Sequence, residues 1–271
     1  MPAESFIKYI RTHFREAVDL LRDYEEHGRE EDLHQFRIRL KKIRCALDCM
    51  QKIGDNAKLI KVRHRVKRIF RQTGEVRDAQ ILLQWLKKNR MPLTIARNKP
   101  DERLAELEKQ LRKDIPPQLK KLRRKQGILL EVAGKYASED IEACFFNLRK
   151  LFRQLISAEV KVEQWHELRK LAKKIVYSFH WLPVEQFNFL KRSTEIERLD
   201  ELQAAIGLWH DEIVRKEWMG SQKNFLSGDE KLKKEFRRTW IHIRESETVH
   251  AKQVRHLLKL EQRKILQSLQ G

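Results

Sequence analysis

The segment from Leu33 to Leu47 concentrates positive charge without any neighbouring carboxylate. Its sequence, LHQFRIRLKKIRCAL, holds five Lys or Arg residues and one His, and it contains no Asp or Glu. Lysine and arginine donate charge-assisted hydrogen bonds to phosphate and carboxylate oxygens, and protonated histidine does the same. The glutamates that usually precede such lysines by four residues, and balance their charge, are absent. This pattern indicates that the segment binds an anion.

The spacing of these residues predicts an amphipathic helix. At about 100° per residue, the apolar side chains share one face, which consists of Leu33, Phe36, Leu40, Ile43 and Leu47. A stripe beside that face holds His34, Arg37, Lys41 and Arg44. The stripe therefore presents four cationic or hydrogen-bonding groups along roughly 15 Å of helix at the edge of the core.

Two other segments carry similar stripes. Residues 56–74 hold seven Lys or Arg residues and His64 but no Asp or Glu, and one helical turn separates Arg63, Lys67 and Arg71. The apolar side of this expected helix holds Leu59, Val62, Val66 and Ile69. Near the start of the chain, acidic residues occupy the other sides of a helix whose basic face holds Lys8, Arg11, Arg15 and Arg22. Like charges on helices that pack together repel one another unless an anion lies between them. The three stripes together favour a bound anion.

The composition of the whole chain agrees with an anionic partner. Its 271 residues include 59 Lys+Arg and 39 Asp+Glu, which gives a formal net charge of +20. Such an excess favours association with nucleic acid, an anionic membrane surface or a phosphate polymer. Hydrophobic residues make up 41% of the chain and recur at helical spacing, so we expect a folded protein.

The scarce Gly and Pro residues, nine and six in number, separate long periodic segments. This punctuation predicts an all-α protein. Gly74 and Gly207 fall between expected helices, and Pro116 and Pro117 are expected to kink or split one helix. We expect ten helices, over residues 4–26, 32–52, 56–72, 76–90, 101–133, 139–158, 163–182, 188–206, 209–222 and 230–268.

Other features indicate a cytoplasmic protein that does not enter a membrane. The first residues, MPAESFIKYIRTHF, form an amphipathic basic segment rather than a signal peptide. The longest uncharged run, IVYSFHWLPV at residues 175–184, is too short to span a bilayer. Cys45, Cys49 and Cys144 lack metal-ligand spacing, so we expect reduced, buried thiols.

The basic helix at His34 has a second copy later in the chain. HQFRIRLKKIRCAL from His34 recurs as HELRKLAKKIVYSF from His166, and GEVRDAQILL from Gly74 is matched by GLWHDEIVRK from Gly207. The repeat predicts two antiparallel helical bundles, residues 1–134 and 135–271, related by a pseudo-twofold axis. The net charge is +14 for residues 1–133 and +6 for residues 134–271. We therefore expect the first half to contribute more to anion binding.

In these four segments the sequence resembles the CHAD domain, an α-helical family named for its histidines. Each half shows a His-x-x-Arg helix with two basic residues four and five positions after the Arg, and then a Gly-x-x-x-Asp segment. The resemblance implies two bundles around a basic cleft or channel that binds inorganic polyphosphate, and association with polyphosphate granules in the cytoplasm. The second copy departs from the pattern at Val176, where a basic residue is expected, and at His210, which stands where the first copy has Arg77.

The resemblance also implies which side chains would meet the polymer. They are His34, Arg37, Lys41 and Lys42, with their counterparts His166, Arg169, Lys173 and Lys174. The other predicted polyphosphate-binding residues are Lys8, Arg11, Arg15, Arg22, Arg44, Arg63, Lys67, Arg71, Arg149 and Arg153. For the two histidines, donation to phosphate and hydrogen bonding between bundles are equally open interpretations.

Polyphosphate fits these residues better than the alternatives do. A phosphate chain offers dense charge and many acceptor oxygens, so it needs Lys and Arg at helical-turn spacing but no aromatic platforms. A single-stranded nucleic-acid binder would place aromatic residues among the cations, whereas apolar-face positions hold most of Phe6, Phe14, Phe36, Phe70, Trp85 and Phe179. Nucleic acid is therefore the second candidate partner, and an acidic protein on a helical scaffold is the third.

The sequence contains no pattern that indicates an enzyme, a metal site or a cofactor. It has no Gly-rich phosphate loop, no nucleophile elbow and no patterned carboxylate cluster, and its His and Cys residues lack metal-ligand spacing. Asp78 and Asp211 are expected near helix starts, where they would balance the helix dipole and orient nearby Arg or Lys residues. The predicted function is thus non-enzymatic binding.

Overall fold

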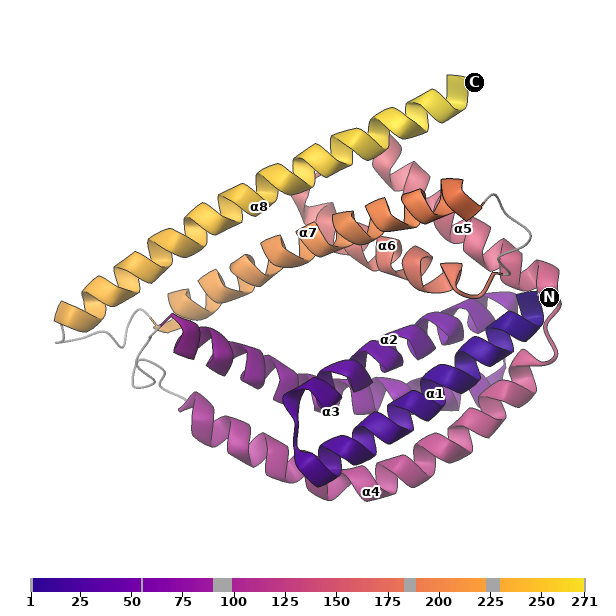
Figure 1. The fold of residues 1–271 in the computed structure, drawn as a ribbon, viewed down its shortest axis with the longest axis horizontal. Coiled ribbons are helices and arrows are strands. Elements are labelled where there is room, and N and C mark those ends of the chain that lie inside the picture. The colour runs from indigo at the N-terminus through magenta and orange to yellow at the C-terminus, as the bar shows by residue number, and fades with distance from the viewer. Residues whose placement is uncertain (1, 55, 90–98, 183–188, 223–229, 271) are drawn as a thin grey trace. The chain divides into compact units, whose positions relative to one another are not determined.

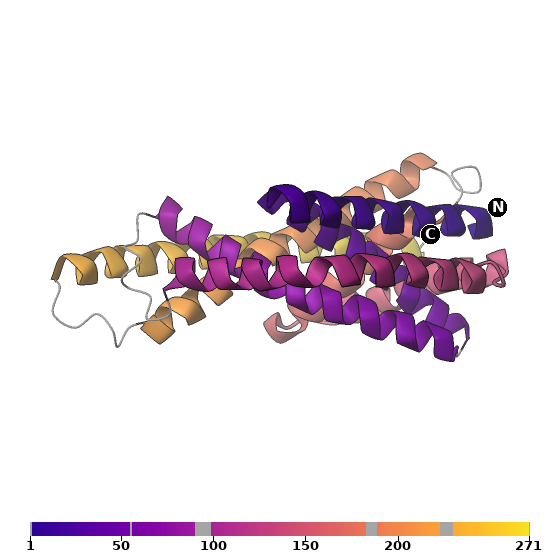
Figure 2. The same cartoon turned by 90° about the horizontal axis from the view of Figure 1, so that it is seen from below.

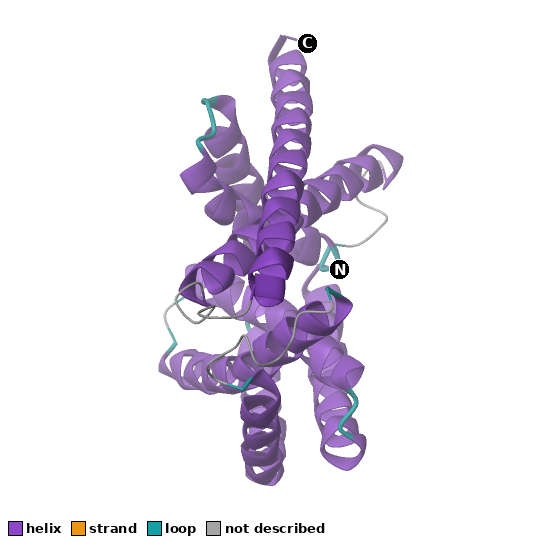
Figure 3. Ribbon diagram, turned by 90° about the vertical axis from the view of Figure 1, so that its left-hand side faces the viewer, coloured by secondary structure: helices purple, strands orange, loops and turns teal. Residues whose placement is uncertain are grey.

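The computed structural model describes residues 2–54, 56–89, 99–182, 189–222 and 230–270. Most of these residues lie in helices, which short loops connect (Figure 3). The predicted all-α class is confirmed. The helices are α1 (Pro2–His27), α2 (Glu30–Ile53), α3 (Ala57–Lys88), α4 (Pro100–Ala133), α5 (Ser138–Ser157), α6 (Trp165–Phe179), α7 (Phe189–Gln222) and α8 (Glu230–Gln270), with a short 3-10 helix at Val162–Gln164 before α6.

The first compact unit is a four-helix bundle. α1 packs against α2 and α4, and α3 packs against the same two helices (Figures 1 and 2). The start of α5 and residues 180–182 complete this unit, where the buried Trp181 ring lies 4.9 Å from the Phe6 ring. The division between the units falls inside α5, after Cys144, and the predicted bundles 1–134 and 135–271 stay a prediction. The pseudo-twofold repeat stays a prediction.

The second compact unit contains the rest of α5 together with α6, α7 and α8. α7 packs against both α6 and α8. An ion pair of 2.7 Å between Arg198 and Glu261 joins α7 to α8, and Gln262 of α8 donates to the Ile156 carbonyl of α5 at 3.0 Å. Hydrogen bonds and packing thus connect each helix of this unit to a neighbour.

The apolar faces predicted for α2 and α3 lie in the core of the first unit. The buried residues include the whole predicted face of α2 and, from α3, Leu59, Val62, Val66 and Ile69. Each fully buried aliphatic side chain contributes about 1.5–3 kcal/mol to folding. The three cysteines are free and buried, as predicted. Because the apolar faces of α2 and α3 are buried in the core, the basic stripes beside those faces lie at the edge of the core.

Two predicted helix boundaries are wrong. Gly74 lies inside α3 and Gly207 inside α7, so each expected pair of helices is one continuous helix. Glycine in a helix costs about 1 kcal/mol relative to alanine, which a well-packed helix tolerates. Here the small residue has a packing role, because a Cβ on Gly74 would lie 2.9 Å from Nη1 of Arg37.

α4 also differs from the expected break, because it continues through Pro116 and Pro117 as a single helix. Both prolines are exposed. None of the described helices is both long and apolar enough to cross a membrane.

Candidate anion-binding site

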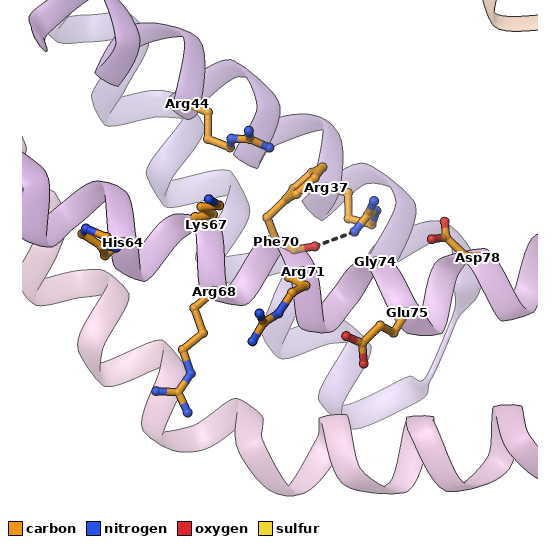
Figure 4. A pocket seen from close by; sticks show the side chains of 10 residues that line it. All are labelled: Arg37, Arg44, His64, Lys67, Arg68, Phe70, Arg71, Gly74, Glu75 and Asp78. Carbon is orange, nitrogen blue, oxygen red and sulfur yellow. Dashed lines mark hydrogen bonds between the residues drawn. The ribbon is translucent and has the colours of Figure 1, made fainter. Parts of the chain in front are cut away.

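An open hollow of about 700 Å³ lies on the first unit where α2 meets α3 (Figure 4). Five cationic side chains line it, accompanied by two carboxylates, one imidazole, one phenyl ring and one glycine. α2 contributes Arg37 and Arg44, and α3 contributes His64, Lys67, Arg68, Phe70, Arg71, Gly74, Glu75 and Asp78. We call this the α2–α3 hollow. Its cations exceed its carboxylates, so its field favours an anion.

Arg37 is anchored at the edge of the α2–α3 hollow. Its Nη1 donates to the Phe70 carbonyl oxygen at 2.8 Å and to Thr73 Oγ1 at 3.4 Å. The absence of a Cβ on Gly74 allows this approach. Burial lowers the pKa of Arg37, but an arginine side chain remains protonated at any physiological pH. The chain therefore holds a fixed positive charge at this position.

Phe70 organises two of the cations. The guanidinium carbons of Arg37 and Arg44 lie 4.3 Å and 4.7 Å from the centre of its ring, and Figure 4 shows the ring between them. A cation on an aromatic face gains about 0.5–1 kcal/mol at an exposed site. The helical spacing predicted a core position for Phe70, but the residue is only half-buried. The two arginines that flank the ring belong to α2, so the sequence of α3 alone could not predict this contact.

Lys67, Arg68 and Arg71 supply the exposed cations of the hollow. Within the described part of the chain, none of the three has a carboxylate at ion-pair distance. Lys67 and Arg71 were predicted site residues, while Arg68 and His64 were not, because they lie off the stripe that begins at Arg63. The hollow thus collects cations from two faces of α3.

Two carboxylates, Glu75 and Asp78, lie at one end of the hollow (Figure 4). The prediction that Asp78 lies near the start of a helix is wrong. Asp78 lies well inside α3, which begins at Ala57 and ends at Lys88. Asp211 likewise lies inside α7. The pKa of Asp78 is raised, because its partial removal from water outweighs the opposing effect of the positive charges on Arg37, Lys41 and Arg77. Asp78 therefore acts on neighbouring cations rather than on a helix dipole.

The other predicted residues of the first unit lie outside the hollow. Lys8, Arg11, Arg15 and Arg22 are all exposed on α1, and Arg22 pairs with Asp19 at 3.8 Å. Arg63 pairs with Asp48 of α2 at 3.3 Å and also contacts Gln51. His34, Lys41 and Lys42 are half-buried on α2. Burial, followed by the charge of Arg77, lowers the pKa of His34, which favours its neutral form.

In the second unit, the predicted cations meet different surroundings. Arg149 forms a two-pronged ion pair with Glu195, with Nη2 to oxygen distances of 2.8 Å and 2.6 Å. Arg169 is half-buried and would lie 2.8 Å from a Cβ on Gly207. The exposed His166 ring lies 5.4 Å from that of His210. Arg153 is exposed, and Lys173 and Lys174 are half-buried.

No group of three or more His, Cys, Asp or Glu side chains could hold a metal ion in the ranges that the structure describes.

Comparison with known proteins gives a match to one family model and matches to solved structures. The family model described as the CHAD domain matches residues 12–220. The fold is similar to that of the crystal structure of the CHAD domain from the plant Ricinus communis, with a TM-score of 0.71 over 95% of this chain and 91% of that chain. The two sequences are 14% identical, so this likeness concerns the fold. No curated protein matches the sequence.

Proposed function

This chain belongs to the CHAD domain family, and we propose that it binds inorganic polyphosphate, without catalysing a reaction, at the α2–α3 hollow. The family is associated with polyphosphate binding in general. The observation that carries the proposal is the cluster of five cations around one hollow, whose described lining holds only two carboxylates. A polymer with a charge on every phosphate satisfies such a cluster with many contacts at once.

The arrangement of the cations supports a two-part contact with the polymer. Arg37 and Arg44 are held in place by Phe70, so they offer donors that lose little freedom on binding. Lys67, Arg68 and Arg71 are exposed, and their side chains adapt to the positions of successive phosphates. The fixed pair thus orients the polymer, and the exposed residues add positive charge that attracts its phosphates.

The surroundings of Phe70 favour polyphosphate over nucleic acid. It is the one aromatic ring other than the imidazole of His64 among the described residues that line the α2–α3 hollow. Because guanidinium groups lie against it at 4.3 Å and 4.7 Å, they occupy the surface on which a base would stack. A ligand without bases does not need that surface.

The residues at the hollow also support a binding role. The described residues that line it include no Ser, Thr, Tyr or Cys side chain, so none of them supplies a hydroxyl or thiol nucleophile for attack on a phosphorus atom. In the proposed role, the protein retains the polymer in the cytoplasm, in association with polyphosphate granules.

Neutralising two exposed cations tests the proposal. We expect Lys67→Gln with Arg71→Gln to weaken binding of long-chain polyphosphate at least about tenfold, because each charge-assisted contact contributes roughly 1.5–3 kcal/mol. Lys87→Gln with Lys88→Gln is the matched control, because both lysines are exposed at the other end of the same helix. Isothermal titration of the full chain measures both affinities. Equal affinities for the two variants would remove the hollow from the binding site.

A further inference from the structure

A second group of cations lies on the α4 side of α3. Lys61, Arg65 and Arg68 recur at intervals of four and three residues and so share one face of α3. Two contacts show that this face meets α4: Arg65 Nη1 donates to Gln118 Oε1 at 3.2 Å, and Gln72 Nε2 donates to Asp114 Oδ2 at 3.0 Å.

α4 adds cations to the same place. α3 and α4 run antiparallel here, because the contacts that join Gln72 to Asp114 and Arg65 to Gln118 are followed by an ion pair of 3.0 Å between Lys58 and Glu131. Lys125 lies between the last two of these contacts, opposite Lys61. Arg124 is its neighbour in the chain. We call the four residues Lys61, Arg65, Arg124 and Lys125 the α3–α4 basic surface.

The charges of the α3–α4 basic surface are not balanced by nearby carboxylates. Burial, together with the charges of Arg124, Lys61 and Arg65, lowers the pKa of Lys125. In the part of the chain that the structure describes, Lys61, Arg124 and Lys125 have no ion-pair partner. The acids at the two ends, Asp114 and Glu131, are already bound to Gln72 and Lys58. Four like charges therefore meet without an internal counter-ion, which is unfavourable unless an external anion binds.

Arg68 connects this surface to the α2–α3 hollow. It is one of the residues that line the hollow, and it follows Arg65 by one helical turn on α3. In Figure 4, Arg68 extends from α3 on the side opposite Arg44. Positive charge therefore continues around α3, whose diameter with side chains is about 10–12 Å. A flexible polyanion that leaves the hollow meets an unbroken series of donors on this route.

From this geometry we propose that a bound polyphosphate chain continues from the α2–α3 hollow past Arg68 onto the α3–α4 basic surface. The inference rests on the proposed function and adds the path of the polymer. Its consequence is a dependence on chain length. Tripolyphosphate is long enough to contact the hollow but not both sites, whereas a long-chain polyphosphate engages both.

Paired substitutions on α4 test this path. Arg124→Gln with Lys125→Gln removes two charges from the α3–α4 basic surface. Arg112→Gln with Arg123→Gln removes the same charge from the side of α4 that faces α1, where the Arg112 guanidinium lies 6.0 Å from the centre of the Tyr24 ring and Gln126 donates to the Arg11 carbonyl at 3.3 Å. Lys61→Gln repeats the test from α3, in case the α4 variant folds poorly. Circular dichroism checks the fold of each variant.

We expect the Arg124 and Lys125 variant to bind long-chain polyphosphate about fivefold to tenfold more weakly, and to bind tripolyphosphate with unchanged affinity. The slope of log affinity against log salt should decrease by about 0.7 for each lost contact. The control pair should change neither affinity by more than about twofold, since isolated surface charges contribute little.

Several outcomes would overturn the path. One is an equal loss of long-chain polyphosphate affinity in the α4 variant and in its control. Another is a loss of tripolyphosphate affinity as large as the loss for the long chain. The third is unchanged long-chain affinity in both the α4 variant and Lys61→Gln. A loss confined to single-stranded DNA would assign the surface to nucleic acid instead. These results differ from a failure of the proposed function, which would appear as weak binding of both phosphate probes by the unaltered chain.

Discussion

Arg37 of α2 lies so close to Gly74 of α3 that a Cβ on the glycine would be 2.9 Å from Nη1 of the arginine. The same relationship recurs in the second unit, where a Cβ on Gly207 would lie 2.8 Å from Nη2 of Arg169. In both units the arginine of the His-x-x-Arg segment therefore meets the glycine of the Gly-x-x-x-Asp segment. The two motifs form one contact between adjacent helices.

This contact makes Gly74→Ala an informative change. Alanine favours a helix over glycine by about 1 kcal/mol, but its Cβ displaces the end of Arg37 and breaks the bond to the Phe70 carbonyl, which costs about as much. We expect the free energy of unfolding to change by less than about 1 kcal/mol, and polyphosphate affinity to fall because Arg37 leaves its position.

Gly127→Ala is the control for this comparison. Gly127 lies within α4, and no atom lies within 4 Å of the place that an alanine Cβ would take there. Alanine should therefore raise the free energy of unfolding by about 0.5–1 kcal/mol. Chemical denaturation gives both values. An equal gain from the two substitutions would show that Arg37 does not need the space above Gly74.

The apolar faces of α2 and α3 could be predicted from sequence because a single helix determines its own periodicity. The 3.6-residue repeat places Leu33, Leu40 and Val66 on buried faces, and all three are fully buried. The stripes beside them follow from the same repeat, which is why Lys67 and Arg71 were predicted correctly as neighbours on one helix face. Whether they contact polyphosphate remains a proposal.

The partners of these residues could not be predicted, because they belong to other helices. Arg63 is one turn from Lys67, yet it pairs with Asp48 of α2, and Arg149 pairs with Glu195 of α7. The rule that pairs charges four residues apart concerns one helix only. Gly74 resembled a helix end for the same reason, since the arginine that requires it comes from α2.

Gly207→Ala should have a larger effect on stability than Gly74→Ala. Three atoms of Arg169 lie within 3.3 Å of the Cβ position at Gly207, with Nη2 at 2.8 Å, Cζ at 3.2 Å and Nε at 3.3 Å. The whole guanidinium group must move, so we expect a loss of about 1–2 kcal/mol. Gly220→Ala in the same helix has open space and should not destabilise. Thermal unfolding of the two variants makes the comparison, and equal melting temperatures would contradict it.

Arg37 and Lys67 should separate stability from binding. Arg37→Gln removes a half-buried donor from the Phe70 carbonyl and a cation from the Phe70 ring, so we expect a loss of about 1–2 kcal/mol in unfolding free energy. Lys67→Gln, at an exposed position, should change stability by less than about 0.5 kcal/mol. Both should weaken polyphosphate binding. Urea denaturation measures the unfolding free energy of each variant, and isothermal titration measures its affinity for polyphosphate. If Arg37→Gln were as stable as the unaltered chain, the contacts of Arg37 would not contribute to stability.

The stability of the first unit should depend on pH through His13. Its ring packs edge-on against Tyr9 with centres 4.3 Å apart, and its Nδ1 lies 3.1 Å from Glu16 Oε2. Burial lowers the pKa of His13 to about 4, against a partial opposing effect of the bond to Glu16. The folded chain therefore favours the neutral ring, while the unfolded chain binds a proton near the ordinary pKa of about 6.5.

The sign of the effect follows from this difference. Above about pH 6.5 the ring is neutral in both states, and its contribution to stability is fully present. As the pH falls from about 6.5 to about 4 the unfolded state binds a proton that the folded state does not, so stability is lost, on the order of 3 kcal/mol in total.

His13→Gln removes the titrating group but keeps a polar side chain beside Glu16, which also pairs with Arg39 at 2.8 Å. Carboxylates that titrate over the same range affect both proteins, so the difference between their urea unfolding free energies isolates His13. We expect this difference to change steadily below about pH 6.5 as the unaltered chain loses stability relative to the variant, and a constant difference from pH 7 to pH 4 would show that His13 keeps an ordinary pKa in the folded chain.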